Sequence, residues 1–151
     1  MGRRMTGKHS IEALFTYRLH VLKKQTDRAM NDAFTASLSL SLTEARLLLT
    51  VGAFGPLSVS DLGRLSNLDR SQASRATDVL ERKGLLAKTS NEADARGVLV
   101  ALTTQGRNLY RRAATISKST NDAILATLSD HEREVLDTVL AKLVENGRES
   151  D

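Results

Sequence analysis

The segment "SVSDLGRLSNLDRSQASRATDVLERKG", residues 58–84, decides the fold because it combines two helix starts, a turn and a helix stop. Ser58 is a typical residue for capping the start of a helix, and so is Asp69, which is followed three residues later by a glutamine in a capping-box-like pair. Asn67 favours a turn between the two starts, since Asn tolerates a left-handed backbone. Gly84 is a good residue for ending the second helix. The segment therefore predicts two short helices joined by a tight turn.

The second helix, residues 69–83, has two chemically different faces. Its apolar side chains are expected to pack against the rest of the domain: Ala73, Ala76, Val79 and Leu80. The opposite face carries cations, hydroxyl groups and an amide: Arg70, Ser71, Gln72, Ser74 and Arg75. Such groups hydrogen-bond phosphates and base edges in the major groove of DNA. An ordinary solvated helix face is the alternative interpretation, but the preceding helix and turn complete a helix-turn-helix pattern and favour DNA.

Two further helices are predicted before this segment. Residues 9–38 have apolar side chains at helical spacing and contain neither Gly nor Pro, which predicts one long amphipathic helix. A connector of alternating Leu and Ser follows. Thr43 is then expected to cap a short apolar helix that ends near Gly52.

A β-hairpin and two more helices are predicted after the segment. The β-prone runs 85–90 and 98–103 are joined by a loop of about seven residues, which is longer than a tight hairpin needs. A long helix is expected from Thr103 to about Leu128, and a capping box beginning at Ser129 starts the last helix. The sequence thus predicts a mainly α protein with a small β-hairpin.

The composition excludes several classes of protein. Hydrophobic residues make up 40% of the 151 residues but aromatic residues only 3%, so the core must be aliphatic. With no cysteine there is neither a disulfide nor a thiolate metal site, which fits a reducing cytoplasm. No apolar run approaches the roughly 18 residues that suggest a membrane span, and no secretory signal is present. The formal net charge of +4 is modest, so its meaning depends on where the cations lie.

Catalytic and metal-binding motifs are also missing from the sequence. It contains no phosphate-binding loop, nucleophile elbow or paired-histidine signature, so we expect no enzyme activity. His9, His20 and His131 do not have the spacing of metal ligands, and we expect neither a metal nor a cofactor.

Three stretches carry a resemblance to a known family: "SRATDVLERKGLL", "EADARGVLVALTTQG" and "LSDHEREVLDTVLAKL". Together they resemble the MarR family of winged helix-turn-helix transcription regulators, over nearly the whole chain. The resemblance implies a single domain over residues 1–151 and a homodimer. Residues 43–103 would form the DNA-binding lobe, and residues 9–38 and 104–147 would be mainly dimerisation helices.

The resemblance also implies how DNA is bound. Arg70, Ser71, Gln72, Ser74 and Arg75 match the helix that enters the major groove. Asp94 and Arg96 match a pair at the tip of the hairpin, or wing, in which the aspartate holds the arginine that reaches the minor groove. A minor groove has a concentrated negative potential that attracts such an arginine. A plain surface ion pair is the alternative for these two residues.

Two positions of the wing depart from the family pattern. Lys88 stands where the family often has an arginine, which keeps the charge but loses the bidentate fork. Gly97 follows Arg96 where another side chain is common.

One recognition helix per chain in a dimer predicts a pseudo-palindromic double-stranded operator with half-sites about 34 Å apart.

A small aromatic or anionic effector that releases the DNA is a further expectation from the family. Arg18 lies in the apolar stripe of the first helix, flanked by Leu14 and Leu22, where a cation needs a partner. A carboxylate-bearing ligand is one candidate partner; a salt bridge between helices, or a side chain that extends to the surface, is the alternative. Tyr17 and His20 are weaker candidates for the same site.

The function that follows is a sequence-specific DNA-binding regulator. Repression is the usual role in the family, whereas the effector, the operator and the target genes are not readable from the sequence. A winged-helix module that binds proteins instead of DNA is the alternative. Such a module should have an acidic or apolar first turn in its second helix, and Arg70 and Arg75 argue against it.

Overall fold

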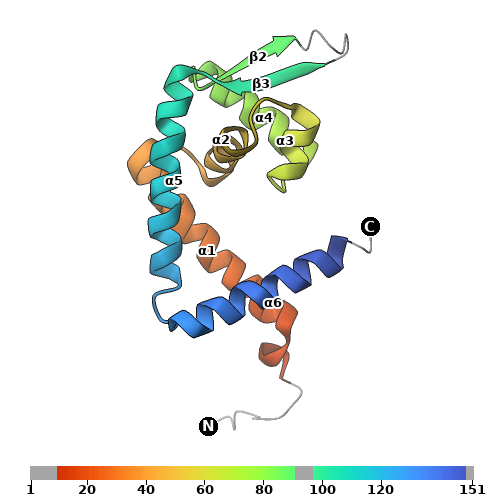
Figure 1. The fold of residues 1–151 in the computed structure, drawn as a ribbon, viewed down its shortest axis with the longest axis vertical. Coiled ribbons are helices and arrows are strands. Elements are labelled where there is room, and N and C mark those ends of the chain that lie inside the picture. The colour runs from red at the N-terminus through yellow and green to blue at the C-terminus, as the bar shows by residue number, and fades with distance from the viewer. Residues whose placement is uncertain (1–9, 91–96, 149–151) are drawn as a thin grey trace, which may run out of the picture. The chain divides into compact units, whose positions relative to one another are not determined.

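The computed structural model describes residues 10–90 and 97–148 (Figure 1). The chain divides into two compact units, one ending at Ser117 and the other beginning at Lys118. The elements that lie wholly in the first unit are η1 (Ile11–Ala13), α1 (Phe15–Leu38), α2 (Leu42–Phe54), β1 (Leu57–Ser58), α3 (Val59–Leu65), α4 (Arg70–Arg82), β2 (Leu86–Ser90) and β3 (Val98–Leu102). Helix α5 (Thr104–Ile124) begins in the first unit, and α6 (Asp130–Arg148) belongs to the second.

The predicted helix-turn-helix is confirmed as α3, a turn and α4. The Ser58 hydroxyl accepts the backbone N–H of Asp61 at 3.1 Å and starts α3. Asn67 has a φ of 55°, the left-handed value expected of the turn. A reciprocal capping box at Asp69 then starts α4. The two helices cross closely at Gly63, where an added Cβ would lie 3.3 Å from the Cβ of Ala73.

The hairpin is also confirmed, and it belongs to a sheet that the sequence did not predict in full. Among the described residues the sheet has three antiparallel strands in the order β1-β3-β2. Strands β2 and β3 pair in register from Leu86↔Leu102 to Ser90↔Val98. The additional strand β1 pairs with β3 through Leu57↔Val100. A two-residue strand is too short to show an alternating pattern, so β1 gives no signal in the sequence.

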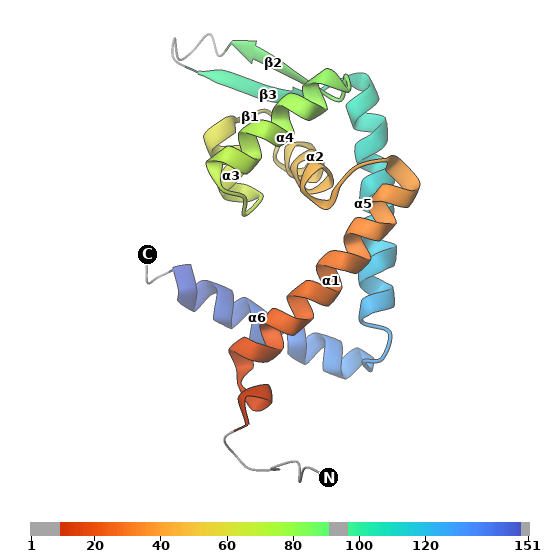
Figure 2. The same cartoon turned by 180° about the vertical axis from the view of Figure 1, so that it is seen from behind.

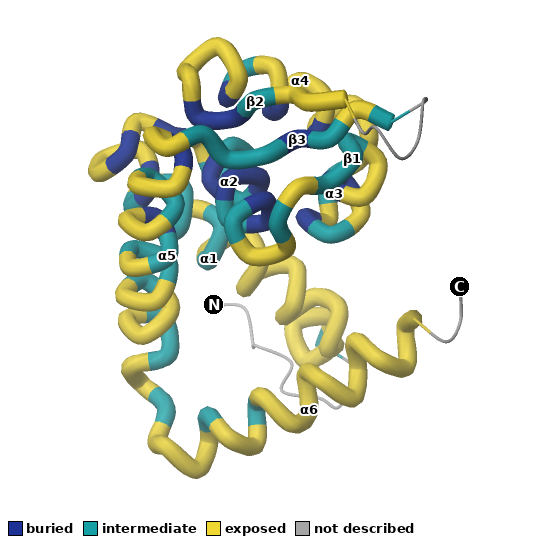
Figure 3. Tube along the Cα trace, turned by 45° about the horizontal axis from the view of Figure 1, so that its top comes forward, coloured by how far each residue is buried: buried dark blue, intermediate teal, exposed yellow. Residues whose placement is uncertain are grey.

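The core is aliphatic, as the composition predicted. Helix α2 lies at its centre and buries Leu47, Leu48 and Val51. Phe34 of α1 and other buried side chains from α3, α4, β2 and β3 close around it. Figure 2 shows α2, α3 and α4 gathered beneath the β2–β3 hairpin, and the dark segments of Figure 3 mark where the chain is buried.

Four predicted helix boundaries were wrong. The first α-helix begins at Phe15 and not at residue 9, because Leu14 has an extended backbone and residues Ile11–Ala13 form a separate 3₁₀ turn. Helix α2 begins after Ser41 and not at Thr43. Ser41 and Glu44 form a reciprocal capping box, which satisfies two terminal N–H groups where Thr43 would satisfy one.

The same helix continues past Gly52 to Phe54 and ends at Gly55, which has a φ of 78°. Helix α5 ends at Ile124, four residues earlier than predicted. The capping box at Ser129 that starts α6 is confirmed, with the Ser129 hydroxyl accepting the Glu132 N–H at 3.2 Å. In the part of the chain that the structure describes, no helix is long and apolar enough to cross a membrane.

Candidate nucleic-acid interface

Helix α4 turns a polar face toward solvent. The predicted contact residues on it are all exposed: Arg70, Ser71, Gln72, Ser74 and Arg75. Ala73, Ala76 and Leu80 are buried on the opposite side, as predicted. The helix therefore presents donors and cations outward while its small apolar side chains hold it against the lobe.

Thr77 also belongs to the buried face of α4, although it was not among the side chains predicted to pack there. Its side chain is almost fully buried, and its hydroxyl donates to the Ala73 carbonyl at 2.7 Å. A hydrogen bond one turn back along the helix satisfies the hydroxyl, so it can lie in an apolar environment. A polar side chain gives no sequence signal for such burial.

The charges along α4 are divided between its two halves. Arg70 and Arg75, in the first half, form no ion pair with any residue in the described ranges. The acidic side chains of the second half, Asp78 and Glu81, lie 2.9 Å and 3.7 Å from the ammonium group of Lys88 on β2. Lys88 thus offsets part of the negative charge of the second half, and the positive charge of the first half remains available to an anion.

Lys88 consequently has a structural contact that the sequence did not reveal. The hydrogen bond with Asp78 raises the pKa of Lys88 above its ordinary value of 10.5, and the Glu81 carboxylate acts in the same direction. Lys88 therefore stays protonated and ties strand β2 to helix α4. Asp94 and Arg96 lie outside the described residues, and their wing-tip roles remain predictions.

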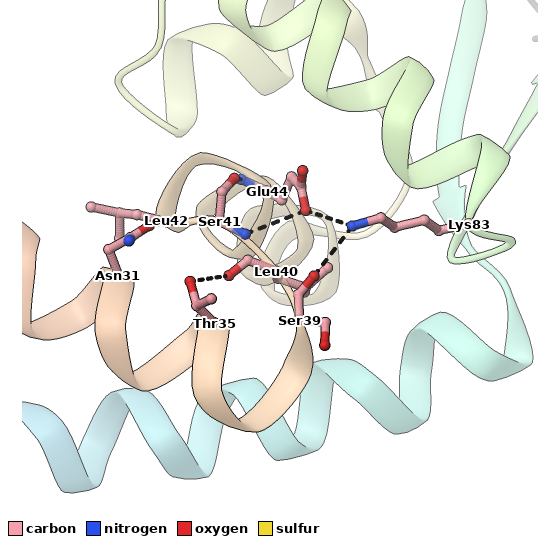
Figure 4. Close-up of polar contacts among 8 residues, drawn as sticks. All are labelled: Asn31, Thr35, Ser39, Leu40, Ser41, Leu42, Glu44 and Lys83. Carbon is pink, nitrogen blue, oxygen red and sulfur yellow. Dashed lines mark hydrogen bonds and ion pairs between the residues drawn. The ribbon is translucent and has the colours of Figure 1, made fainter.

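The end of α4 is fastened to the junction between α1 and α2 (Figure 4). The Lys83 ammonium group donates to Glu44 Oε2 at 2.9 Å and to the Ser39 carbonyl at 3.3 Å. Glu44 Oε2 also accepts the backbone N–H of Ser41 at 3.3 Å, so one carboxylate caps α2 and holds α4. The partners are 39 and 44 residues from Lys83 along the chain, and no local pattern could have predicted this contact.

The Leu-Thr-x-x-Gly pattern at residues 102–106 joins the wing to α5. Thr103 donates its hydroxyl to the Gly84 carbonyl at 2.6 Å and accepts the Gly106 N–H at 3.0 Å. Its backbone N–H donates to the Leu85 carbonyl at 3.1 Å. Gly106 lies so close to that carbonyl that an added Cβ would be 2.0 Å from its oxygen. The motif thus builds a compact joint between the end of α4, strand β3 and α5.

The three residues predicted for an effector site lie on α1 and are exposed: Tyr17, Arg18 and His20. Arg18 Nε donates to the Glu12 carbonyl at 3.0 Å, which ties the 3₁₀ turn to the helix. Leu14 and Leu22 are 54% and 52% exposed, so the apolar stripe around Arg18 is uncovered in the single chain. The effector role of these residues remains a prediction.

The fold and the exposed cationic face of α4 define a winged helix-turn-helix protein, and comparisons with known proteins identify its family. A family model described as MarR family matches residues 38–97. The chain is 30% identical to the HTH-type transcriptional regulator YdgJ of Bacillus subtilis over 137 residues, which is 91% of this chain and 81% of YdgJ. It is 23% identical to the multiple antibiotic resistance protein MarR of Escherichia coli, covering 83% of this chain and 88% of that protein.

Solved structures agree with this result. The chain resembles a putative MarR family regulator from Listeria monocytogenes, solved with a 26mer DNA, with a TM-score of 0.79, 25% identity and 88% coverage of both chains. It also shares the fold of BpsR from Bordetella bronchiseptica, with a TM-score of 0.82, 21% identity and coverage of 91% and 98% of the two chains. The chain belongs to the MarR family and is a transcription regulator.

Proposed function

We propose that this regulator is a repressor that binds a pseudo-palindromic operator as a homodimer and is released by a small aromatic or anionic effector. The observation that carries the DNA-binding part is the first half of α4. Arg70 and Arg75 are exposed there and have no carboxylate partner in the described ranges, while the acids of the second half are held by Lys88. The Listeria regulator, which is similar over most of the chain, was solved with DNA.

In this proposal residues 43–103 form the DNA-binding lobe. The major groove is contacted by Arg70, Ser71, Gln72, Ser74 and Arg75. Arg96, held by Asp94, reaches the minor groove from the wing. Lys88, on the first strand of the wing, lessens the repulsion that Asp78 and Glu81 would exert on the DNA phosphates.

The dimer is supported by apolar side chains that a single chain leaves uncovered. On α1 and the turn before it these are Ile11, Leu14, Phe15, Leu19 and Leu22, and on α6 they are Val135, Val139, Leu140, Leu143 and Val144. Apolar surfaces of this extent are typical of subunit interfaces. Residues 9–38 and 104–147 are accordingly proposed as the dimerisation helices.

DNA binding is tested by fluorescence anisotropy with a labelled duplex from the protein's own upstream region, titrated over several salt concentrations. Arg75→Ala should weaken binding by about 1–3 kcal/mol if Arg75 contacts a base. Arg96→Ala should lower the salt slope by about one. Lys118→Gln is the control, because it removes a cation that pairs only with Asp122 of its own helix among the described residues.

Two outcomes would contradict the DNA assignment. If neither arginine variant changes the affinity or the salt slope, these residues do not contact DNA. If the wild-type protein binds the upstream duplex no better than random DNA, the protein-interaction alternative is preferred.

The dimer and the effector need separate measurements. Sedimentation equilibrium of Leu143→Glu should show dissociation toward a monomer, since a charge on this apolar face disfavours its burial. A thermal-shift screen of aromatic acids, repeated with Arg18→Gln and followed by DNA release, tests the effector. A ligand that raises the melting temperature but leaves DNA affinity unchanged would contradict release by that ligand.

A further inference from the structure

We infer that Gln72 reads guanine in the operator, because its amide oxygen is held by the start of α4 and only its N–H₂ group is left for DNA. This inference rests on the proposed function and adds to it the chemistry of one base in each half-site. Gln72 is the third residue of α4, is exposed, and lies in a first turn without acidic residues. The first residues of a helix that enters the major groove are those that reach the base edges.

The Gln72 amide is held at one end. The backbone N–H of Asp69 donates to Gln72 Oε1 at 3.3 Å, while the backbone N–H of Gln72 donates to Asp69 Oδ1 at 2.7 Å. The two bonds join the same residues in both directions and form the capping box. An N–H cannot donate to an N–H₂ group, so the oxygen of the amide, and not its nitrogen, must face Asp69. The orientation of the amide is therefore defined by its chemistry.

The N–H that holds this amide belongs to a turn that is itself fixed. The backbone N–H of Leu68, just before Asp69, donates to the Gly63 carbonyl at 3.0 Å. In the same turn the buried hydroxyl of Ser66 donates to the Leu62 carbonyl. The cap is therefore formed before DNA arrives, and little conformational freedom of the amide is lost on binding.

The end of the amide left for DNA is a hydrogen-bond donor. Among the described residues Gln72 Nε2 has no acceptor. A glutamine usually reads adenine with both ends of its amide, donating to N7 and accepting from N6. Here the oxygen is turned toward the helix backbone, and pairing of this kind would break the cap. Guanine instead offers two adjacent acceptors, N7 and O6, which suit the two hydrogens of Nε2.

The neighbouring side chains favour the same base. Arg70 and Arg75 are exposed, and a guanidinium group can donate but not accept. Ser71 and Ser74 carry hydroxyl groups, which do both and set no preference. The long polar side chains in this half of α4 are thus all donors, and guanine is the base that presents two acceptors in the major groove.

A purely structural role for Gln72 is the alternative, and Gln72→Glu separates the two. A glutamate keeps the cap, since one carboxylate oxygen can accept the Asp69 N–H. The other oxygen then places an acceptor where Nε2 was. If Gln72 contacts a base, the preference at that position should change from guanine to a base that donates, cytosine or adenine. If Gln72 only caps the helix, the preference should not change.

The test is selection of bound duplexes from a randomised pool by the full-length protein, followed by sequencing. The wild type should prefer guanine to adenine by about fivefold or more at one position of each half-site, which is the discrimination of one good base contact. Gln72→Ala should reduce this preference to about twofold or less, and Gln72→Glu should change the preferred base. Gln25→Ala is the matched control, because it removes the same amide from an exposed position on α1 and should keep the wild-type preferences.

A modified base checks the contact directly. Replacing the selected guanine by 7-deazaguanine removes the N7 acceptor, and it should weaken wild-type binding by about threefold or more while leaving Gln72→Ala unchanged. Circular dichroism checks that the variants fold, and Gln72→Glu, which keeps the cap, gives the answer if Gln72→Ala is unstable.

Three results would overturn the inference: adenine preferred at the position that Gln72→Ala relaxes, no position relaxed by that variant, or guanine still preferred by Gln72→Glu. Enrichment of a sequence with no dependence on Gln72 would refute this inference alone. If the wild type enriches no sequence at all, the proposed function fails with it.

Discussion

Replacing Gly106 by alanine is the substitution whose effect the structure defines most sharply. An added Cβ would lie 2.0 Å from the carbonyl oxygen of Leu85 and 3.0 Å from its carbon. Carbon and oxygen atoms normally approach to about 3.3 Å, so the first turn of α5 must move by roughly 1.3 Å. The same carbonyl accepts the backbone N–H of Thr103 at 3.1 Å, and a movement of this size would break that bond.

The expected cost combines three contributions. Overpacking a close contact costs about 1–3 kcal/mol, and losing the Thr103 hydrogen bond costs about 1 kcal/mol. The better helix propensity of alanine returns about 1 kcal/mol. We therefore expect Gly106→Ala to lower the free energy of unfolding by about 1–3 kcal/mol, which corresponds to a fall in melting temperature of about 3–9 °C for a chain of this size.

Urea denaturation followed by circular dichroism measures this change, at one protein concentration because dimerisation would add to the apparent stability. Gly147→Ala is the matched control. Gly147 is also helical, but a Cβ there would meet nothing within 4 Å, so this variant should be unchanged or up to about 1 kcal/mol more stable. If Gly106→Ala is as stable as Gly147→Ala, the close packing on Leu85 does not constrain the fold and the reasoning is refuted.

Three further predictions concern other contacts. Gly52→Ala should lower the free energy of unfolding by about 1–3 kcal/mol in a urea titration, because the Tyr110 ring would have to move; an unchanged midpoint would contradict this. Lys88→Met should cost up to about 1 kcal/mol in the same assay at low salt and less at high salt, and equal losses at both would argue against an ion pair with the α4 carboxylates. The hydrogen bond from Lys23, followed by one from an α2 arginine, holds the pKa of Asp27 below 3.8. The Asp27 carboxylate therefore contributes its full stabilisation above about pH 5, and this contribution is lost as the pH falls through the folded-state pKa. The melting temperature of Asp27→Asn should accordingly fall less than that of the wild type between about pH 5 and about pH 2.

Local signals determined much of the fold. The starts of α3, α4 and α6 were predicted correctly, since a capping side chain and the N–H that it accepts are only two or three residues apart in the chain. The turn at Asn67 and the helix stop at Gly84 were readable for the same reason, because each depends on the backbone freedom of one residue. The periodicity of the α4 residues predicted which side chains are exposed. The cations and hydroxyl groups among them indicated a DNA-binding protein.

The tertiary structure decided the rest. Lys83 and Lys88 were readable only as cations, and their carboxylate partners are brought to them by folding. The reason for Gly106 lies in a carbonyl 21 positions earlier, and β1 exists only because β3 offers it a partner. The pocket lined by α2, β3 and α5 likewise depends on these three elements meeting. Contacts between distant segments leave no periodic or capping signal, so the sequence alone determined the elements and the polar face, while packing decided which charges are neutralised and which remain available to a ligand.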